Sequence, residues 1–469
     1  MMVETMVGAA MAEFKQKLEH FCKSADFSEL TPELGDQIGR ELQRALAFAG
    51  VAAYRAFLLS YETQDDAVYD AQGEAFRFKQ VSNKTFMTPF GRMGLARRCY
   101  QNKEDSKSYV PLEAAWGMEG EYMMPQVREA VLFSCAHVTP EETVQLLGKC
   151  ALFQPHASTI KRAIEETGNR IEAHRDALDE AVRAEEPPPE ATRALVVSAD
   201  GATVLMNEKG LRFGRRAERP RGDEPEEIPT AYRVAMVGSV SHYGAPKSPG
   251  ETPQRLQSRY VSHMPERGCP TFKTRLEAEL EDADKKLPAD TAHILLLDGA
   301  RELWCYFDKN PRYDRYHRCI DFWHAVEHLS VAAEALFGSG DAAKRWYEKY
   351  YHILHESDDG AERICRSIDY YASKIKRSKT SAKHLREERT YFKRNGDRMP
   401  YATFRKNGWP IGSGPIEAAA KTLVKTRLCR SGMRWTRPGG QHILNLRTYV
   451  KSNRWDSAWQ HIKQLERAA

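Results

Sequence analysis

No Cys-x-x-Cys pair occurs among the nine cysteines of this 469-residue chain, and the number of cysteines is odd. This pattern excludes a disulfide framework and a cysteine-rich zinc site, and it indicates a reducing compartment. No stretch reaches the ~18 apolar residues that a membrane-spanning helix requires. The N-terminus carries Glu4 and no basic region before the apolar residues at 8–11, which argues against a secretory signal. Internal repeats and low-complexity tracts are missing too. We therefore expect a cytoplasmic protein without a membrane partner.

Basic charge is concentrated in the last fifth of the chain. Residues 371–469 hold 23 Lys and Arg but only 6 Asp and Glu, a net charge of +17. Since the whole chain carries +5, the rest carries −12. This separation favours a polyanionic partner such as DNA, although a solvated helical face would have the same composition. Four tryptophans in the basic region indicate that it is folded and is not a disordered tail: Trp409, Trp435, Trp455 and Trp459.

The N-terminal part is predicted to be mainly helical. Within residues 9–62, an apolar stripe at three- and four-residue spacing is formed by Leu42, Ala45, Leu46 and Ala49. Such a stripe is typical of a helix that faces a core. Residues 84–101 alternate with a two-residue period around Gly91, which predicts a small β-hairpin.

Residues 124–180 return to a helical pattern with a short break. Thr139 and Glu142 form a capping-box pattern at a helix start, and the break at 153–156 precedes a second helix. Two short helices around a turn are typical of a helix-turn-helix, whose last helix would place Lys161 and Arg162 near DNA. Plain packing of two amphipathic helices gives the same pattern, so both interpretations stay open.

A Pro- and Glu-rich linker at 185–190 separates the helical part from an α/β part. We predict buried strands at 194–200, 204–206, 232–240 and 293–297, a charged helix at 271–286, and a strand that becomes a helix within 320–336. A surface loop is expected at 208–229 and a charged helical insertion at 341–395.

Three acidic residues occupy the ends of predicted elements. Asp200 and Asp298 each follow an apolar strand, and Glu417 follows a Gly-Ser-Gly-Pro sequence that predicts the first turn of a helix. Carboxylates brought together repel one another unless a cation intervenes, and oxygen ligands suit Mg²⁺ or Mn²⁺. Two such ions can activate the attacking oxygen and stabilise the leaving oxygen of an in-line phosphoryl displacement. Taken singly, each Asp-Gly pair is also a common turn signal.

Basic residues follow Glu417 directly. Lys421 and Lys425 lie at four-residue steps and are expected on the same helix face as the carboxylate. Arg427, Arg430 and Arg434 come next. We expect this group to hold phosphates that flank the reacting one. Trp435 fits either stacking on distorted DNA or anchoring a core.

Several segments together give the chain a recognisable pattern. They are residues 198–201, 296–300, 320–329, 411–417, 432–435 and 445–447. In these segments, and best over 195–460, the chain resembles the DDE transposases of bacterial insertion sequences, most closely the ISKra family within the Mutator-like group. The resemblance implies an RNase H-like core in which Asp200, Asp298 and Glu417 bind two Mg²⁺ or Mn²⁺ ions.

The same resemblance assigns further residues and partners. It places Asp321 and His324 in the surroundings of the active site; capping and packing of a helix start is the competing interpretation. Relatives often carry a zinc knuckle after the hairpin, but here only Cys99 is present, so zinc there is doubtful. The implied reaction cuts the element's terminal inverted repeats and joins the 3′-OH to target DNA. Pairing of two ends implies a homodimer on DNA, associated with the nucleoid.

We therefore expect an α/β protein with four parts. These are an N-terminal helical region (1–83), a hairpin plus helix-turn-helix-like DNA-binding region (84–183), a linker (184–192) and an RNase H-like catalytic domain (193–469) with a helical insertion at about 331–400. Two other functions stay open: a non-catalytic DNA-binding repressor descended from a transposase, and an RNase H-like nuclease.

Overall fold

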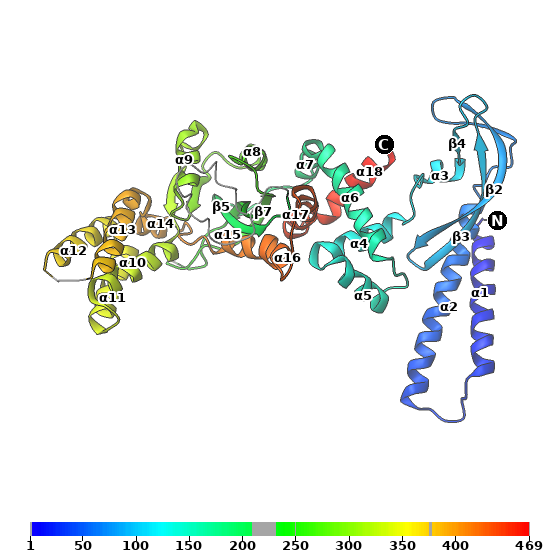
Figure 1. Ribbon diagram of the computed structural model, residues 1–469, viewed down its shortest axis with the longest axis horizontal. Helices are drawn as coiled ribbons and strands as arrows, with labels where there is room; N and C mark the ends of the chain where they lie inside the picture. The colour runs from blue at the N-terminus through cyan, green and yellow to red at the C-terminus, as the bar shows by residue number, and fades with distance from the viewer. Residues whose placement is uncertain (1, 209–230, 249, 375–377, 469) are drawn as a thin grey trace, which may run out of the picture. The chain divides into compact units, whose positions relative to one another are not determined.

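The computed structural model describes residues 2–208, 231–248, 250–374 and 378–468. The chain has a mixed α/β architecture with two separate β-sheets, as expected (Figure 1). It divides into two compact units, residues 1–174 with 459–469, and residues 175–458. The predicted surface loop at 208–229 lies outside the described residues, except for Glu208.

The first unit combines a helical pair, a four-stranded sheet and a group of short helices. Its elements are α1 (Met2–Ser24), α2 (Pro32–Leu59), β1 (Ala67–Tyr69), β2 (Ala75–Thr88), β3 (Gly91–Gln101), β4 (Ser108–Tyr109), α3 (Pro111–Trp116), α4 (Pro125–His137), α5 (Pro140–Cys150) and α6 (Ala157–Ala173). Helix α18 (Trp455–Ala468) starts in the second unit and ends in the first.

Helices α1 and α2 lie side by side, as Figure 1 shows. The side chain of Thr31 caps α2 by accepting a hydrogen bond from the amide of Leu34. The predicted apolar stripe is only half covered: Ala45 is fully buried, whereas Leu46 is 58% exposed. By length and composition, α2 is also the one helix in the described part of the chain that is able to cross a membrane. Its longest run without a charged residue is 45–54, and core helices of water-soluble proteins can have the same length and composition.

The predicted hairpin is part of a larger sheet, with strand order β1-β2-β3-β4. Strands β2 and β3 pair antiparallel from Thr88 and Gly91 outward, and Gly91 adopts a left-handed backbone with φ 112°. Strand β2 begins at Ala75, earlier than predicted: apart from buried Phe76 its first half is exposed, and polar residues such as Lys79 and Gln80 interrupt the apolar alternation.

Helices α4, α5 and α6 form the group predicted from residues 124–180. Thr139 and Glu142 make the expected capping box: the amide of Glu142 donates to Thr139 Oγ1 at 3.1 Å, and the amide of Thr139 donates to Glu142 Oε2 at 2.8 Å. The predicted break separates α5 from α6. Residues of α4, α5 and α6, such as Val131, Leu147 and Ile160, share a core with the β2–β3 hairpin.

The second unit is built on a five-stranded sheet with helices on both faces. Before the insertion its elements are α7 (Arg175–Ala184), β5 (Ala194–Leu205), β6 (Tyr232–Tyr243), β7 (Arg255–His263), α8 (Pro270–Lys286), β8 (Ala292–Leu297), α9 (Arg301–Lys309), η1 (Pro311–Tyr313) and β9 (His317–Ile320). The strand order is β7-β6-β5-β8-β9, with β5, β6 and β7 antiparallel and β8 and β9 parallel to β5.

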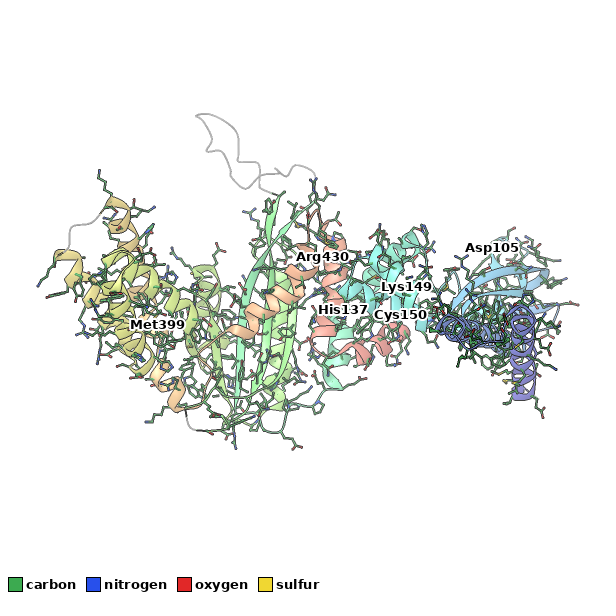
Figure 2. All side chains as sticks on the ribbon, turned by 90° about the horizontal axis from the view of Figure 1, so that it is seen from below. Asp105, His137, Lys149, Cys150, Met399 and Arg430 are labelled. Atoms are coloured by element: carbon green, nitrogen blue, oxygen red, sulfur yellow. The ribbon has the colours of Figure 1, made fainter. Side chains whose placement is uncertain are left out.

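The insertion and the C-terminal region follow β9. The insertion contains α10 (Phe322–Phe337), α11 (Asp341–Glu356), α12 (Gly360–Lys374), α13 (Lys379–Asn395), η2 (Gly396–Arg398) and α14 (Tyr401–Lys406). Met399, labelled in Figure 2, is fully buried there. The chain then returns to the sheet through α15 (Gly414–Ala419), the π-helical η3 (Ala420–Lys425), α16 (Thr426–Leu428) and α17 (Arg437–Lys451). The prediction of a helical region at 341–395 agrees with these elements.

Alternation along the strands decides which helices cover each face. Gly238 in β6 faces α8, since a Cβ there would lie 3.0 Å from atoms of both Phe272 and Leu276. Ser262 in β7 is paired directly with Val237 of β6, which points to the face opposite Gly238, and its side chain bonds to Thr448 of α17 at 2.8 Å. Helices α8 and α9 therefore lie on one side of the sheet, and α15, η3 and α17 on the other (Figure 1).

The Pro- and Glu-rich segment is fixed to the second unit. Lys286 donates to the carbonyl of Arg183 at 2.6 Å and to that of Glu186 at 3.1 Å. The Glu186 carboxylate pairs with Arg259 and Arg454, both buried. The boundary between the two units falls before α7, near residue 174, so residues 185–190 belong to the second unit.

Candidate functional site

Asp200 lies in the middle of the sheet. It belongs to β5 and is opposite Val237 of β6, and β5 continues without interruption to Leu205. The two predicted strand pieces at 194–200 and 204–206 are thus one strand, and the interpretation of Asp200-Gly201 as a turn is wrong. Gly201 is needed because a Cβ there would lie 2.5 Å from Cγ1 of Val234.

Asp298 lies level with Asp200 on the neighbouring strand. The parallel register pairs Val197 with Leu295, so three further residues along each strand bring the chain to Asp200 and Asp298. Residues at the same level of adjacent strands point to the same face, about 4.8 Å apart where the strands stay paired. Asp298 forms the strand-to-helix turn before α9, and its Oδ1 accepts a hydrogen bond from the amide of Ala300 at 2.9 Å.

Glu417 comes to the same face from the C-terminal region. Helix α15 starts at Gly414 with Pro415 in its first turn, as predicted, and it packs on β5 and β6. The Glu417 side chain is exposed, near the positive end of this short helix. Lys425, at the end of η3, completes the group.

The charges on this face interact. Burial raises the pKa of Asp200, and the carboxylates of Asp298 and Glu417 raise it further. A hydrogen bond from the amide of Gly201 and the charge of Lys425 lower the pKa of Asp200. Asp200 therefore lies close enough to Asp298 and to Glu417 to be repelled by both carboxylates, and Lys425 offsets part of that repulsion.

A divalent cation suits this set of donors, because three carboxylates supply only hard oxygen ligands. In the conformation seen here, no three His, Cys, Asp or Glu side chains of the described residues are grouped tightly enough to hold a metal ion. Two of the carboxylates are occupied by neighbouring backbone amides, those of Gly201 and Ala300. A shared ion would therefore require the carboxyl groups to come closer together than they lie here.

The predicted basic face is formed by η3. Lys421 and Lys425 are exposed and form no ion pair with any described residue. Buried Arg447 of α17 supports the segment: its Nε donates to the carbonyl of Leu423 at 2.6 Å, and the guanidinium also reaches the carbonyl of Thr422. These bonds satisfy carbonyl groups that the wider π-helical turn leaves available.

Arg427 does not belong to the basic face. It is only 1% exposed, and its guanidinium lies over the ring of Trp435 at 5.5 Å. The prediction that it holds phosphates is therefore wrong, because the π-helical turn rotates it inward. Trp435 itself is an anchor: its Nε1 donates to the carbonyl of Leu428 at 2.8 Å, and its amide to that of Leu205 at 3.0 Å.

Arg430 and Arg434 are exposed in the segment between α16 and α17. Figure 2 labels Arg430, which extends from the residues that follow α16. Their assignment to phosphate stays a prediction. In the first unit, Lys161 and Arg162 lie exposed on α6; Lys161 pairs with Glu141 at 2.7 Å, and Arg162 with Glu166 at 3.7 Å. Exposed pairs of this kind are weak.

Asp321 connects the site to the loop that precedes Glu417. It caps α10, accepting from the amide of His324 at 2.7 Å, and its other oxygen accepts from the amide of Ser413. Its own amide donates to the carbonyl of Leu297, next to Asp298, at 2.8 Å. The capping interpretation is correct, and the cap also fixes the positions of two acidic segments relative to each other.

His324 and His328 face the insertion. His324 lies one turn before His328, with ring centroids 4.9 Å apart, and its Nδ1 is 3.7 Å from Glu327. His328 bonds to Glu388 of α13 at 2.6 Å and stacks on Tyr391 at 3.6 Å. Sequence patterns gave no sign of Glu388 and Tyr391, because they lie in a helix whose charge pattern is that of any surface helix.

A cavity of about 810 Å³ lies on the opposite face of the sheet, bordered by α8 and α9. Asp200 and Asp298 form part of its wall, together with Arg233, Lys273 and Arg301. The cavity is thus lined by basic side chains, and Glu266 and Glu302 also border it.

Cys99 lies on β3, where its Sγ is 3.9 Å from the carbonyl oxygen of Arg97.

Compared with models of protein families and with curated proteins, the chain matches none of them.

Proposed function

We propose that this protein is a DNA transposase of the DDE type, similar to those of the ISKra family, with an RNase H-like catalytic core. The observation that carries the proposal is the convergence of Asp200, Asp298 and Glu417 on one face of the five-stranded sheet, beside Lys425. The strand order, three antiparallel strands followed by two parallel ones, supports an RNase H-like core.

The carboxylates would act as ligands of two Mg²⁺ or Mn²⁺ ions. Bound there, the ions would activate the attacking oxygen and stabilise the leaving oxygen of a phosphoryl displacement. The residues of the chain do the positioning: the sheet fixes Asp200 and Asp298, and Asp321 fixes the loop that carries Glu417. Lys421 and Lys425, with Arg430 and Arg434 further on, would hold the flanking phosphates without reading sequence.

The partners follow from the same chemistry. Both reaction steps, the cut at each terminal inverted repeat and the attack of the 3′-OH on target DNA, are attacks at phosphorus, so one site serves both. The helices α4 to α6 of the first unit are the proposed reader of the element's ends, with Lys161 and Arg162 on α6. A homodimer would pair the two ends on DNA.

The test is incubation of the protein with the genomic DNA that flanks its gene, in the presence of Mg²⁺. We expect nicked and joined products with the wild-type protein and none with Glu417→Gln, while both bind DNA within a few fold. Cleavage without joining would favour an RNase H-like nuclease. Metal-independent binding without any cleavage would favour a repressor and would overturn the proposal.

A further inference from the structure

Helix α13 of the insertion carries a groove beside the acidic site. The groove has a volume of about 400 Å³ and is lined by Lys383, Arg386, Glu387, Thr390, Tyr391 and Arg394. These residues recur at three- and four-residue steps, so they form one face of the helix. We call this face the α13 groove.

The α13 groove is joined directly to the loop of Asp298. Arg394 donates to the carbonyl of Gly299 at 3.4 Å. The ring of Tyr391 is packed so closely on the same residue that a Cβ at Gly299 would lie 2.6 Å from its Cε2. Tyr391 is 7% exposed and is held from behind by its stacking on His328. The groove therefore has a fixed position relative to the acidic site.

Positive charge predominates in the α13 groove. It has three basic side chains and one acidic one, and Lys383 is 3.8 Å from that acid, Glu387, in an exposed pair that contributes little. Within the described residues, neither Arg386 nor Arg394 forms an ion pair. Charged guanidinium groups held on one rigid face and lacking carboxylate partners are suited to phosphate.

The other side of the same helix has the opposite character. A second cavity there is lined by three basic residues, Arg366, Arg389 and Lys393, and by five acids: Asp358, Asp359, Glu362, Asp369 and Asp397. Arg389 is paired with Asp369, with Nη2 2.7 Å from Oδ2. The composition of α13 as a whole therefore does not explain the α13 groove: of the three arginines of the helix, Arg389 lies on the acidic side and is paired, whereas Arg386 and Arg394 line the groove and form no ion pair within the described residues.

We infer that the α13 groove binds the DNA backbone on the side of the cut opposite to η3. The inference rests on the proposed function, because a strand whose phosphate reaches Asp298 must continue in both directions from it. Arg386 and Arg394 are eight residues apart, or about 12 Å along the helix, which matches about three phosphates of one strand.

The experiment compares two surface variants of α13. Lys383→Ala/Arg386→Ala removes two charges from the groove without touching the Asp298 loop, and Lys393→Ala on the acidic side is the matched control. Binding of a fluorescent duplex containing the flanking genomic DNA is measured by anisotropy in Ca²⁺ over a range of salt concentrations. We expect the groove variant to bind about tenfold more weakly and to lower the slope of log K against log salt by about 2. The control should match the wild type.

Other outcomes separate this inference from the proposed function. If the groove variant remains folded, as judged by an unchanged thermal melt, and binds DNA with the affinity and salt dependence of the wild type, the inference is overturned even if the protein cleaves DNA. An equal loss with Lys393→Ala would also overturn it, because any charge would then suffice. If poly-glutamate competes as well as DNA, the groove is a general polyanion site and its assignment to DNA is wrong. If the wild-type protein never cleaves DNA but the groove variant still loses DNA binding, the groove remains a DNA-binding site and the proposal of a transposase is rejected.

Discussion

Two groups of carboxylates in the second unit are arranged in opposite ways. In the ionic network, Glu186, Glu279 and Asp282 are matched by Arg259 and Arg454, which are both buried. In the acidic site, Asp200, Asp298 and Glu417 have no salt bridge within the described residues, and Lys425 acts only at a distance.

The difference separates structural from functional charge. Buried charges that hold a fold together are paired and hydrogen-bonded, because an unpaired one costs several kcal/mol. Acids that share a face and lack basic partners are a liability for folding, which a bound cation would relieve under the proposed function. Five experiments test or refine this comparison, and they are ordered by the size of the expected effect.

The largest effect is expected from breaking the ionic network. Arg454→Ala removes one of two cationic partners from each of two buried carboxylates, leaving Glu186 with Arg259 and Glu279 with Arg183, and it should reduce the free energy of unfolding by about 3 kcal/mol. Urea denaturation measures the loss. Asp298→Asn, in the acidic site, serves as the comparison and should cost far less; equal costs would remove the distinction between the two groups.

The second effect concerns the cation. Saturating Mn²⁺ should raise the melting temperature of the wild-type protein. At a Mn²⁺ concentration about one hundred times its Kd, the free energy of unfolding should increase by about 2.7 kcal/mol. Asp200→Asn should respond little, because it removes a ligand and part of the repulsion. Differential scanning fluorimetry with and without EDTA measures both. An identical rise in the two proteins would mean that the metal binds elsewhere.

The third effect is a pH dependence set by the ionic network. Burial lowers the pKa of His242 to about 4, and Arg259 and Arg454 act in the same direction while Asp282 opposes them. Since the unfolded chain takes up a proton near its ordinary pKa and the folded one does not, stability should fall as the pH drops. Between about pH 7 and about pH 5 the loss is about 2 kcal/mol. Urea denaturation at both pH values should show a smaller loss for His242→Gln; the same loss would assign the effect to other groups.

The fourth experiment concerns Asp321, a carboxylate that accepts hydrogen bonds from two backbone amides. Asp321→Ala would leave the amides of His324 and Ser413 without acceptors and should cost about 1–2 kcal/mol. Because the loop before Glu417 would loosen, we expect slower cleavage with unchanged DNA binding. Thermal melts and single-turnover cleavage assays measure the two consequences. Normal cleavage would show that Asp321 only caps α10.

The smallest effect separates exposed from buried basic residues. Lys421→Ala should weaken DNA binding a few fold and reduce the salt slope by about 0.9. Arg427→Ala should leave the slope unchanged and instead lower the melting temperature, because its guanidinium is buried against Trp435. Anisotropy titrations over a range of salt concentrations provide the slopes. A reduced slope for Arg427→Ala would mean that this side chain leaves its buried position on DNA.

Local signals in the sequence identified much of the architecture. The capping box at Thr139, the proline start of α15 and the apolar runs of β5, β6 and β8 all depend on neighbouring residues, and each was predicted close to its place. Strand β7 and the first half of β2 were missed, because polar residues interrupt their apolar pattern. The inward turn of Arg427 was missed as well, since a π-helical turn has no sequence signature of its own.

The sequence by itself determined the inventory: three isolated acids, a basic C-terminal region and alternating helices and strands. Only the tertiary structure decided that Asp200 is level with Asp298, that Asp321 fixes the loop of Glu417, and that 185–190 is held in an ionic network. The physical reason is separation along the chain. Strand register and side-chain pairing join residues about a hundred or more positions apart, such as Asp200 with Asp298 and Glu186 with Arg454, and no local propensity encodes such contacts.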